Sequence, residues 1–159
     1  MSDAQQDRDQ ADALPAGDII GVLYRQHADV RDLMAQIAKA EGDTRQNGFD
    51  KLKTMLKAHE TAEQKILRPV TRETAGVQET DQRNQEEAKA DQVLAELGSL
   101  DAAGPDFAAK FADFTKAVSD HAEAEEHQEF PTVLASRSIV ERIQLGKAFL
   151  EEFARAFGA

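Results

Sequence analysis

Residues 59–69 read HETAEQKILRP, and residues 121–131 read HAEAEEHQEFP. Both stretches place a glutamate four residues after a histidine and a proline six residues after that glutamate. Residues four apart lie on the same face of an α-helix. The repeated frame therefore predicts two helices, each of which presents one imidazole and one carboxylate side by side.

The histidine and glutamate of each frame continue a stripe of apolar residues. In the second helical segment the stripe is Phe49, Leu52, Leu56, His59, Glu63 and Ile66. In the fourth segment it is Phe111, Phe114, Val118, His121, Glu125 and Gln128. In the first segment it is Leu23, His27, Val30, Met34 and Ile37. Steps of three and four residues keep each stripe on one helical face, so these histidines and glutamates are expected to point toward the interior.

Prolines, glycines and capping residues divide the chain into helical segments. We expect helices over about residues 15–41, 44–68, 78–97, 105–130 and 138–157. The second and fourth are expected to end before Pro69 and Pro131, because proline interrupts a helix. No stretch alternates with the period of a strand. Four long helices with short connections predict an all-α, up-down-up-down four-helix bundle with an additional C-terminal helix that covers one end or side.

Composition limits the classes of function. Residues 1–14 are polar and predict a disordered N-terminal tail, followed by one bundle domain over residues 15–159. The formal net charge of −11 argues against binding nucleic acid or an anionic membrane surface. The absence of cysteine excludes disulfides, thiolate zinc sites and cysteine nucleophiles. The sequence shows neither a signal peptide nor an apolar run of about eighteen residues, so we expect a cytoplasmic protein.

The three stripe histidines are expected to share one layer of the bundle. His27 lies about 15 residues before the first helix turn and His59 about 16 residues after it, which places both about 22–24 Å from that turn. His121 lies about 16 residues into its own helix. The third helix has no histidine, but Glu86 and Glu87 both continue its apolar register. Periodicity alone leaves the choice between these two glutamates open.

Histidine and glutamate in an apolar interior are costly unless they are paired, hydrogen-bonded or bound to a metal. Imidazole and carboxylate groups without thiolate favour iron or manganese over zinc, and three of each exceed the needs of one tetrahedral zinc. His59-Glu60 starts like the zincin motif, but Glu63 stands where that motif has its second histidine. Two octahedral ions would leave about one or two positions open for a small ligand. A buried hydrogen-bonded network without metal is the alternative.

The chain resembles the hemerythrin-like, or HHE cation-binding, domain family over about residues 18–131. The shared features are the isolated His27, the two His-x3-Glu frames that end in proline, the Phe-Pro that closes the second frame, and the third-helix sequence EEAKADQVLAEL at residues 86–97. The resemblance implies a four-helix bundle that holds two non-haem iron ions. Glu87 falls where the family has its third-helix histidine.

The resemblance also implies a set of metal ligands for an oxo- or hydroxo-bridged di-iron centre, with manganese as the alternative metal. The set is His27, His59, Glu63, Glu87, His121 and Glu125. His27 and His59 would bind one ion, His121 would bind the other, and Glu63 and Glu125 would bridge them. Tyr24, three residues before His27, is a candidate cofactor-binding residue, either as a phenolate ligand or as a hydrogen-bond donor; the alternative is a core aromatic.

The ligand set bears on the expected activity. Hemerythrins bind O₂ reversibly with five histidines and two carboxylates, whereas this chain offers a glutamate in place of one imidazole. An anionic oxygen ligand favours Fe(III) over Fe(II), so we hypothesise that stable O₂ carriage is disfavoured. The expected function is catalase-like, peroxidase-like or ferroxidase chemistry on O₂ or peroxide. The alternative is a non-catalytic module that binds O₂, NO or iron, or stores iron; the oligomeric state is not predicted.

Overall fold

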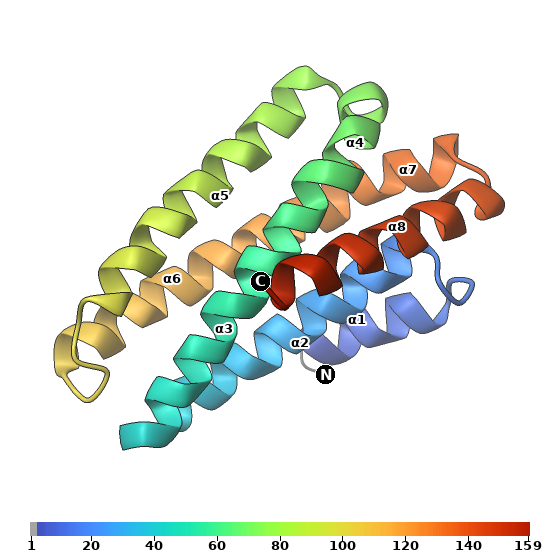
Figure 1. The fold of residues 1–159 in the computed structure, drawn as a ribbon. Coiled ribbons are helices and arrows are strands. Elements are labelled where there is room, and N and C mark those ends of the chain that lie inside the picture. The colour runs from blue at the N-terminus through green and yellow to red at the C-terminus, as the bar shows by residue number, and fades with distance from the viewer. Residues whose placement is uncertain (1–2) are drawn as a thin grey trace.

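The computed structural model describes residues 3–159, and within that range every regular element is a helix (Figure 1). The α-helices are α1 (Asp3–Asp12), α2 (Ile19–Lys39), α3 (Gly42–Ala62), α4 (Arg68–Thr74), α5 (Val77–Gly98), α6 (Pro105–Ala124), α7 (Phe130–Ser136) and α8 (Ile139–Phe157). Two π-helical turns, η1 (Glu63–Leu67) and η2 (Glu125–Glu129), join α3 to α4 and α6 to α7. The prediction of an all-α helical bundle is confirmed.

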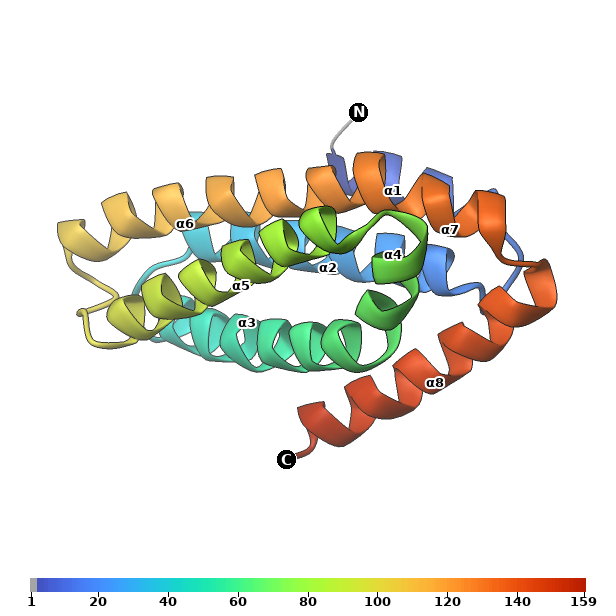
Figure 2. The same cartoon turned by 90° about the horizontal axis from the view of Figure 1, so that it is seen from above.

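The long helices lie side by side around a common interior (Figures 1 and 2). Helix α2 packs against α3 and α6, and α5 packs against α6 and α4. Helix α1 lies along α2, and α8 lies across α3 and α2. Segments that are distant in the sequence therefore surround one interior space, into which all the long helices direct their apolar stripes.

The two proline-containing helices do not stop where the sequence predicted. Each continues past its proline after a π turn, in which the N–H of Arg68 bonds to the carbonyl of Glu63 and the N–H of Phe130 to that of Glu125. Pro69 and Pro131 then occupy the first turn of a new α-helical segment, where the missing N–H is not needed. The expected ends before these prolines were wrong, because a π turn absorbs the interruption without a break in the helix.

The N-terminal residues also differ from the expectation. The predicted disordered tail contains helix α1 instead, whereas residues 1–2 of that prediction lie outside the described residues. Ala4, Asp7 and Ala11 are buried against α2, and Asp7 pairs there with Arg31. Small side chains and ion pairs hold this helix rather than large apolar groups, which is why composition suggested disorder. After it, α2 starts at Ile19 rather than near Pro15, and the carboxylate of its N-cap residue accepts a hydrogen bond from the first turn.

Two apolar clusters divide the interior. The larger cluster joins the C-terminal half of α2 to α3, α5 and α6, and it includes Phe49, Phe107, Phe111 and Phe114. The smaller cluster joins the N-terminal half of α2 to η1, α7 and α8, and it includes Leu23, Leu67, Phe130 and Phe149. Each fully buried side chain of this kind contributes about 1.5–3 kcal/mol. The polar stripe residues lie between the two clusters, so apolar packing on both sides fixes their positions.

Helix α8 approaches the chain closely near the start of α2. A Cβ atom on Gly146 would lie 1.9 Å from the carbonyl oxygen of Gly17, so only glycine allows this packing. Nearby, Arg142 donates a 2.7 Å hydrogen bond to the carboxylate of Asp18, and Ser138 caps α8 with Glu141 in a capping box.

None of the helices between residues 3 and 159 is long and apolar enough to cross a membrane.

Candidate metal centre

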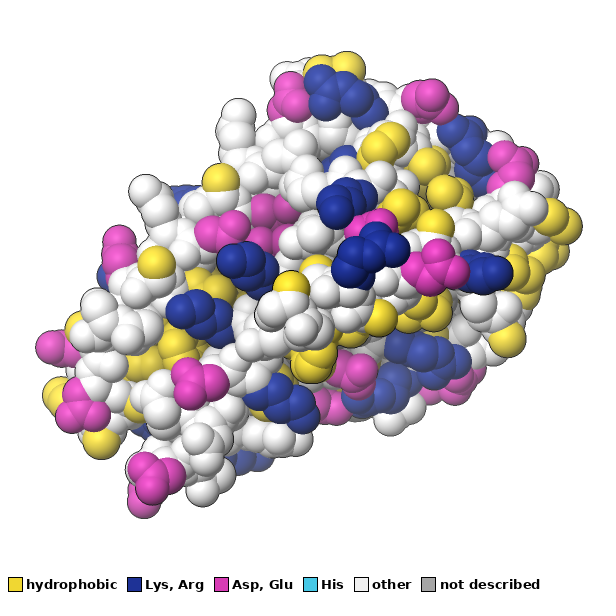
Figure 3. Space-filling view, in the orientation of Figure 1, with side chains coloured by type: hydrophobic (Ala, Val, Ile, Leu, Met, Phe, Trp, Pro, Cys, Tyr) yellow, Lys and Arg dark blue, Asp and Glu magenta, His cyan; other side chains and the backbone are white. Residues whose placement is uncertain are grey.

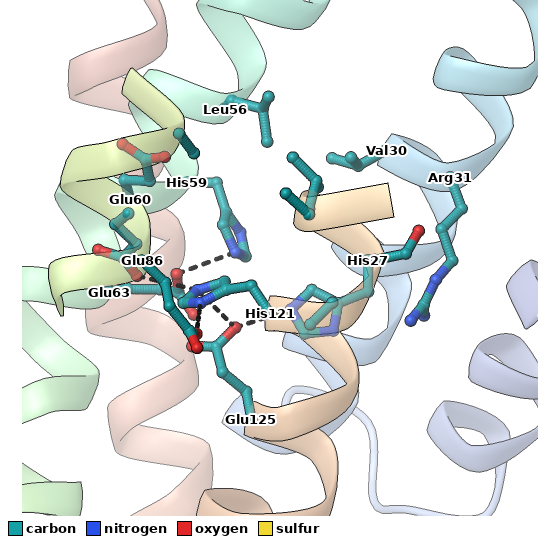
Figure 4. Close-up of a pocket in the computed structure, with 16 residues that line it drawn as sticks. His27, Val30, Arg31, Leu56, His59, Glu60, Glu63, Glu86, His121 and Glu125 are labelled. Atoms are coloured by element: carbon teal, nitrogen blue, oxygen red, sulfur yellow. Dashed lines mark hydrogen bonds and ion pairs between the residues drawn. The ribbon is translucent and has the colours of Figure 1, made fainter. Parts of the chain in front are cut away.

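The structure brings all six sequence-predicted ligands together in the interior (Figure 4). Two groups, each of four residues, place one candidate ligand atom from every member within 4.8 Å of the others. The first group is His27, His59, Glu63 and Glu125. The second group is Glu63, Glu87, His121 and Glu125. Each group marks one candidate metal position. Glu63 and Glu125 belong to both groups, so these two carboxylates are shared by the two positions.

The inner atoms approach one another within a few ångströms. Nε2 of His59 lies 3.1 Å from Oε1 of Glu63, and Nε2 of His27 lies 3.4 Å from Oε1 of Glu125. Nε2 of His121 lies 3.5 Å from that same Glu125 oxygen. Helix α3 and η1 supply one histidine–glutamate pair and α6 and η2 supply the other, each glutamate being the first residue of its π turn. The repeated frame in the sequence thus corresponds to a repeated piece of structure.

Each imidazole is oriented by a hydrogen bond on its outer nitrogen. The Nδ1 partners are Glu126 for His27 at 2.7 Å, Gln26 for His59 at 2.6 Å, and Glu86 for His121 at 2.8 Å. An Nδ1–H that donates to an outer oxygen leaves the Nε2 lone pair directed inward in the neutral ring. Histidine ligands of metals are held by the same arrangement. The Nε2 atoms of the three histidines therefore point toward the carboxylates of the two groups.

Several of the inner atoms are buried and make no hydrogen bond within the described residues. They are Nε2 of His27, Nε2 of His121, both carboxylate oxygens of Glu63, and Oε1 of Glu125. Buried polar atoms are otherwise nearly always paired, because leaving one unpaired costs about 1–3 kcal/mol. Nitrogen and oxygen donors that converge without partners fit bound cations of the iron or manganese type. The residues present therefore suit the group that the sequence predicted.

The structure separates the roles of the two third-helix glutamates. The Glu87 side chain is 5 % exposed, and its Oε1 lies 3.3 Å from Nε2 of His121. The Glu86 side chain is 35 % exposed and contacts His121 from outside, on Nδ1. Glu87 thus belongs among the inner donors, whereas Glu86 orients the histidine.

Arg68 lies inside the carboxylate cluster, although it was not among the residues predicted from the sequence. Its Nη2 lies 2.5 Å from Oε1 of Glu87 and 2.8 Å from Oε2 of Glu125, and its Nη1 lies 2.9 Å from Oε2 of Glu129. In a continuous α-helix, a residue five positions after Glu63 would lie about 140° around the axis from it. The π turn η1 brings Arg68 to the inner face instead. The only sequence feature that could have indicated this position of Arg68 is Pro69, because the π turn that accommodates the proline also shifts the arginine to the inner face.

The carboxylates and the arginine set the charges of the metal-free centre. Burial lowers the pKa of His121, but Glu125 and Glu87 outweigh it and raise that pKa to about 9. Burial and the neighbouring His27 lower the pKa of His59 to about 3, so this ring is neutral. Burial, with the charge of Glu125, raises the pKa of Glu63 well above its ordinary value. The metal-free centre thus holds protons that a bound cation would displace.

A cavity of about 40 Å³ adjoins the inner donors. Its polar wall contains the three histidines, and its apolar wall includes Val30, Leu56, Ala90 and Val118. This space suits a molecule of a few atoms. On the molecular face shown in Figure 3, no described histidine is visible. Tyr24 is not among the residues that line the cavity; its ring packs edge-on against Phe130 at 5.1 Å, and Phe130 stacks on His27. Ligation by Tyr24 stays a prediction.

The chain matches the model of a known protein family. The family model of the hemerythrin HHE cation binding domain matches residues 18–133. This range is more than half of the chain and contains all six inner donors as well as Arg68. Helix α1 and helix α8 lie outside it. The chain matches none of the curated proteins and none of the solved structures with which it was compared.

Proposed function

Because the chain belongs to the hemerythrin HHE cation-binding domain family, we propose that it is a non-haem di-iron protein that reacts with O₂ or peroxide. His27 and His59 would hold one iron ion, His121 and Glu87 would hold the other, and Glu63 and Glu125 would be shared by the two ions. Manganese is the alternative metal. In this proposal α2, α3, α5 and α6 with their π-linked extensions form an up-down-up-down four-helix bundle, which α1 and α8 cover from outside.

One observation carries the proposal. Imidazole nitrogens and carboxylate oxygens from α2, α3, α5, α6 and the two π turns converge in the interior, and five of these atoms are buried without a hydrogen-bond partner among the described residues. A purely structural polar network would pair these atoms with one another. Two cations that accept their lone pairs account for both the convergence and the missing partners.

The ligand types favour redox chemistry over reversible O₂ carriage. Bound iron would supply electron transfer to a small oxidant. Glu87 adds an anionic oxygen where the family has an imidazole, which stabilises the more highly charged ion. The cavity of about 40 Å³ admits a ligand of the size of O₂ or peroxide, and its apolar wall keeps bulk water from the ligands. Peroxide decomposition or iron oxidation therefore suits the site better than storage of many ions.

Hydrogen peroxide turnover tests this proposal. Iron-loaded protein is expected to release O₂ steadily from added peroxide, and Glu63→Ala is expected to abolish that release because it removes a shared ligand. Glu123→Ala, on the exposed face of the same helix as His121, is the matched control and is expected to keep full activity.

The alternative is a module that binds O₂ or NO, or holds iron, without turnover. The small cavity is the observation that favours it, because the same space would hold a diatomic ligand. Tight and reversible ligand binding by the iron-loaded protein, together with negligible peroxide turnover, would replace the redox proposal with this one.

A further inference from the structure

One guanidinium group reaches most of the carboxylates of the centre. Nη2 of Arg68 lies within 4.0 Å of carboxylate oxygens from Glu63, Glu87 and Glu125. The arginine side chain is 5 % exposed, and its Nε donates a 3.2 Å hydrogen bond to Oδ1 of Asn84. Hydrogen bonds on all three nitrogens hold the guanidinium in one place.

The contacts of Arg68 are unequal between the two metal positions. Nη2 reaches Glu63 and Glu125, which both groups share, and Glu87, which only the second group contains. The closest of these contacts, at 2.5 Å, is the one to Glu87, so the arginine charge lies nearest to the donor that belongs to the second group alone. Within the second group, the arginine holds Oε1 of Glu87 and Oε2 of Glu125. Oε1 of Glu125 and both oxygens of Glu63 make no hydrogen bond among the described residues.

We propose that Arg68 is an internal cation that competes with the second metal ion, so that the two metal positions fill in order. The position at His27 and His59 fills first and tightly, and the position at His121 and Glu87 fills second and weakly. The inference rests on the di-iron function proposed above. A positive charge that already contacts two donors of the second position opposes a second cation there. The same charge keeps the buried carboxylates compensated when that position lacks its ion.

Removal of the charge tests the inference. Anaerobic titration of metal-free protein with Fe(II), followed by calorimetry, measures both dissociation constants. The wild type is expected to show two steps whose constants differ by at least about tenfold. Arg68→Met keeps the length of the side chain without its charge, and its second constant is expected to be at least about tenfold lower than in the wild type. Arg68→Lys keeps the charge, so its second step is expected to stay weak.

Arg142→Met is the matched control, because Arg142 is also buried and paired with a carboxylate but lies at the junction of α8 and α2. It is expected to lower the melting temperature without changing the ratio of the two constants. If Arg68→Met is too unstable without metal, iron per chain after dialysis of iron-loaded protein against a chelator gives the same comparison. The variant is then expected to retain more iron than the wild type.

Four outcomes separate the inference from the proposed function. Two equal steps in the wild type, or a second constant that Arg68→Met leaves unchanged, overturn the inference while the metal centre stands. A second step that Arg68→Lys strengthens as much as Arg68→Met does also overturns it, because the charge would then be irrelevant. Failure of every variant and of the wild type to bind Fe(II) overturns the proposed function, and the inference with it.

Discussion

Replacement of Gln26 by leucine should weaken metal binding although Gln26 is not a ligand. In the wild type, Nδ1 of His59 donates to Oε1 of Gln26 at 2.6 Å, which leaves Nε2 free to accept a cation. Without that acceptor, the neutral ring of the metal-free protein can move its proton to Nε2 and donate to Oε1 of Glu63, 3.1 Å away. Metal binding must then break this bond and leave a buried Nδ1–H unpaired.

The magnitude follows from that unpaired group. A buried donor without a partner costs about 1–3 kcal/mol, which corresponds to a loss of about 5- to 150-fold in affinity. We therefore expect the first dissociation constant for Fe(II) to rise by about 10- to 100-fold in Gln26→Leu, the range typical of such outer partners. Gln26→Glu keeps an acceptor on Nδ1 and should bind at least as tightly as the wild type.

Competition with a chelator of known affinity, under anaerobic conditions, measures this constant. Gln46→Leu is the control, because Gln46 makes an exposed hydrogen bond to Asp50 on the first turns of α3 and lies far from the centre. If Gln26→Leu binds Fe(II) as tightly as the wild type and Gln46→Leu, the orientation of His59 does not depend on its outer partner. The assignment of the inward-facing nitrogens would then be wrong.

Three further predictions address stability and proton exchange. The pKa of His121 in the folded state, about 9, lies above its ordinary 6.5. The protonated ring therefore contributes on the order of 3 kcal/mol to the free energy of unfolding. This contribution is complete below pH 6.5 and is lost as the pH rises through 9. The melting temperature of metal-free protein should fall over that range, and His121→Gln should flatten the fall. Binding of Fe(II) at pH 7 should release a proton from the His121 ring, measured as a dependence of the calorimetric heat on buffer ionisation; no such dependence would contradict the charges described here. Gly146→Ala should destabilise the fold by about 1–3 kcal/mol in urea unfolding, because its methyl group would meet the carbonyl oxygen of Gly17; an unchanged midpoint would show that α8 does not pack there.

The structure brings the predicted inner donors together because their positions follow from helical periodicity. His59 and Glu63 continue an apolar stripe four residues apart, and the structure keeps them on one face with 3.1 Å between Nε2 and Oε1. His27 joins them because equal helix lengths on both sides of a turn place residues at equal depth. Periodicity left Glu86 and Glu87 open, since both fit the register, and only the packed helices distinguish the inner from the outer carboxylate.

The parts that the sequence did not predict depend on breaks in that periodicity or on weak interactions. Arg68 reaches the centre because a π turn shifts the register after Glu63, and a constant angle of about 100° per residue cannot anticipate this shift. Helix α1 carries alanines and charged residues, so its attachment through Asp7 and Arg31 left no apolar stripe to detect. For both features, tertiary packing determines the structure, and the local sequence pattern does not indicate it.

Iron content per chain tests the central claim most directly. Protein saturated with Fe(II) under anaerobic conditions and freed of excess metal by gel filtration is expected to contain about two iron ions per chain by elemental analysis. Glu63→Ala, which removes a carboxylate shared by both positions, is expected to contain far less. Wild-type protein without stoichiometric metal, or a Glu63→Ala variant with the same iron content, would contradict the account.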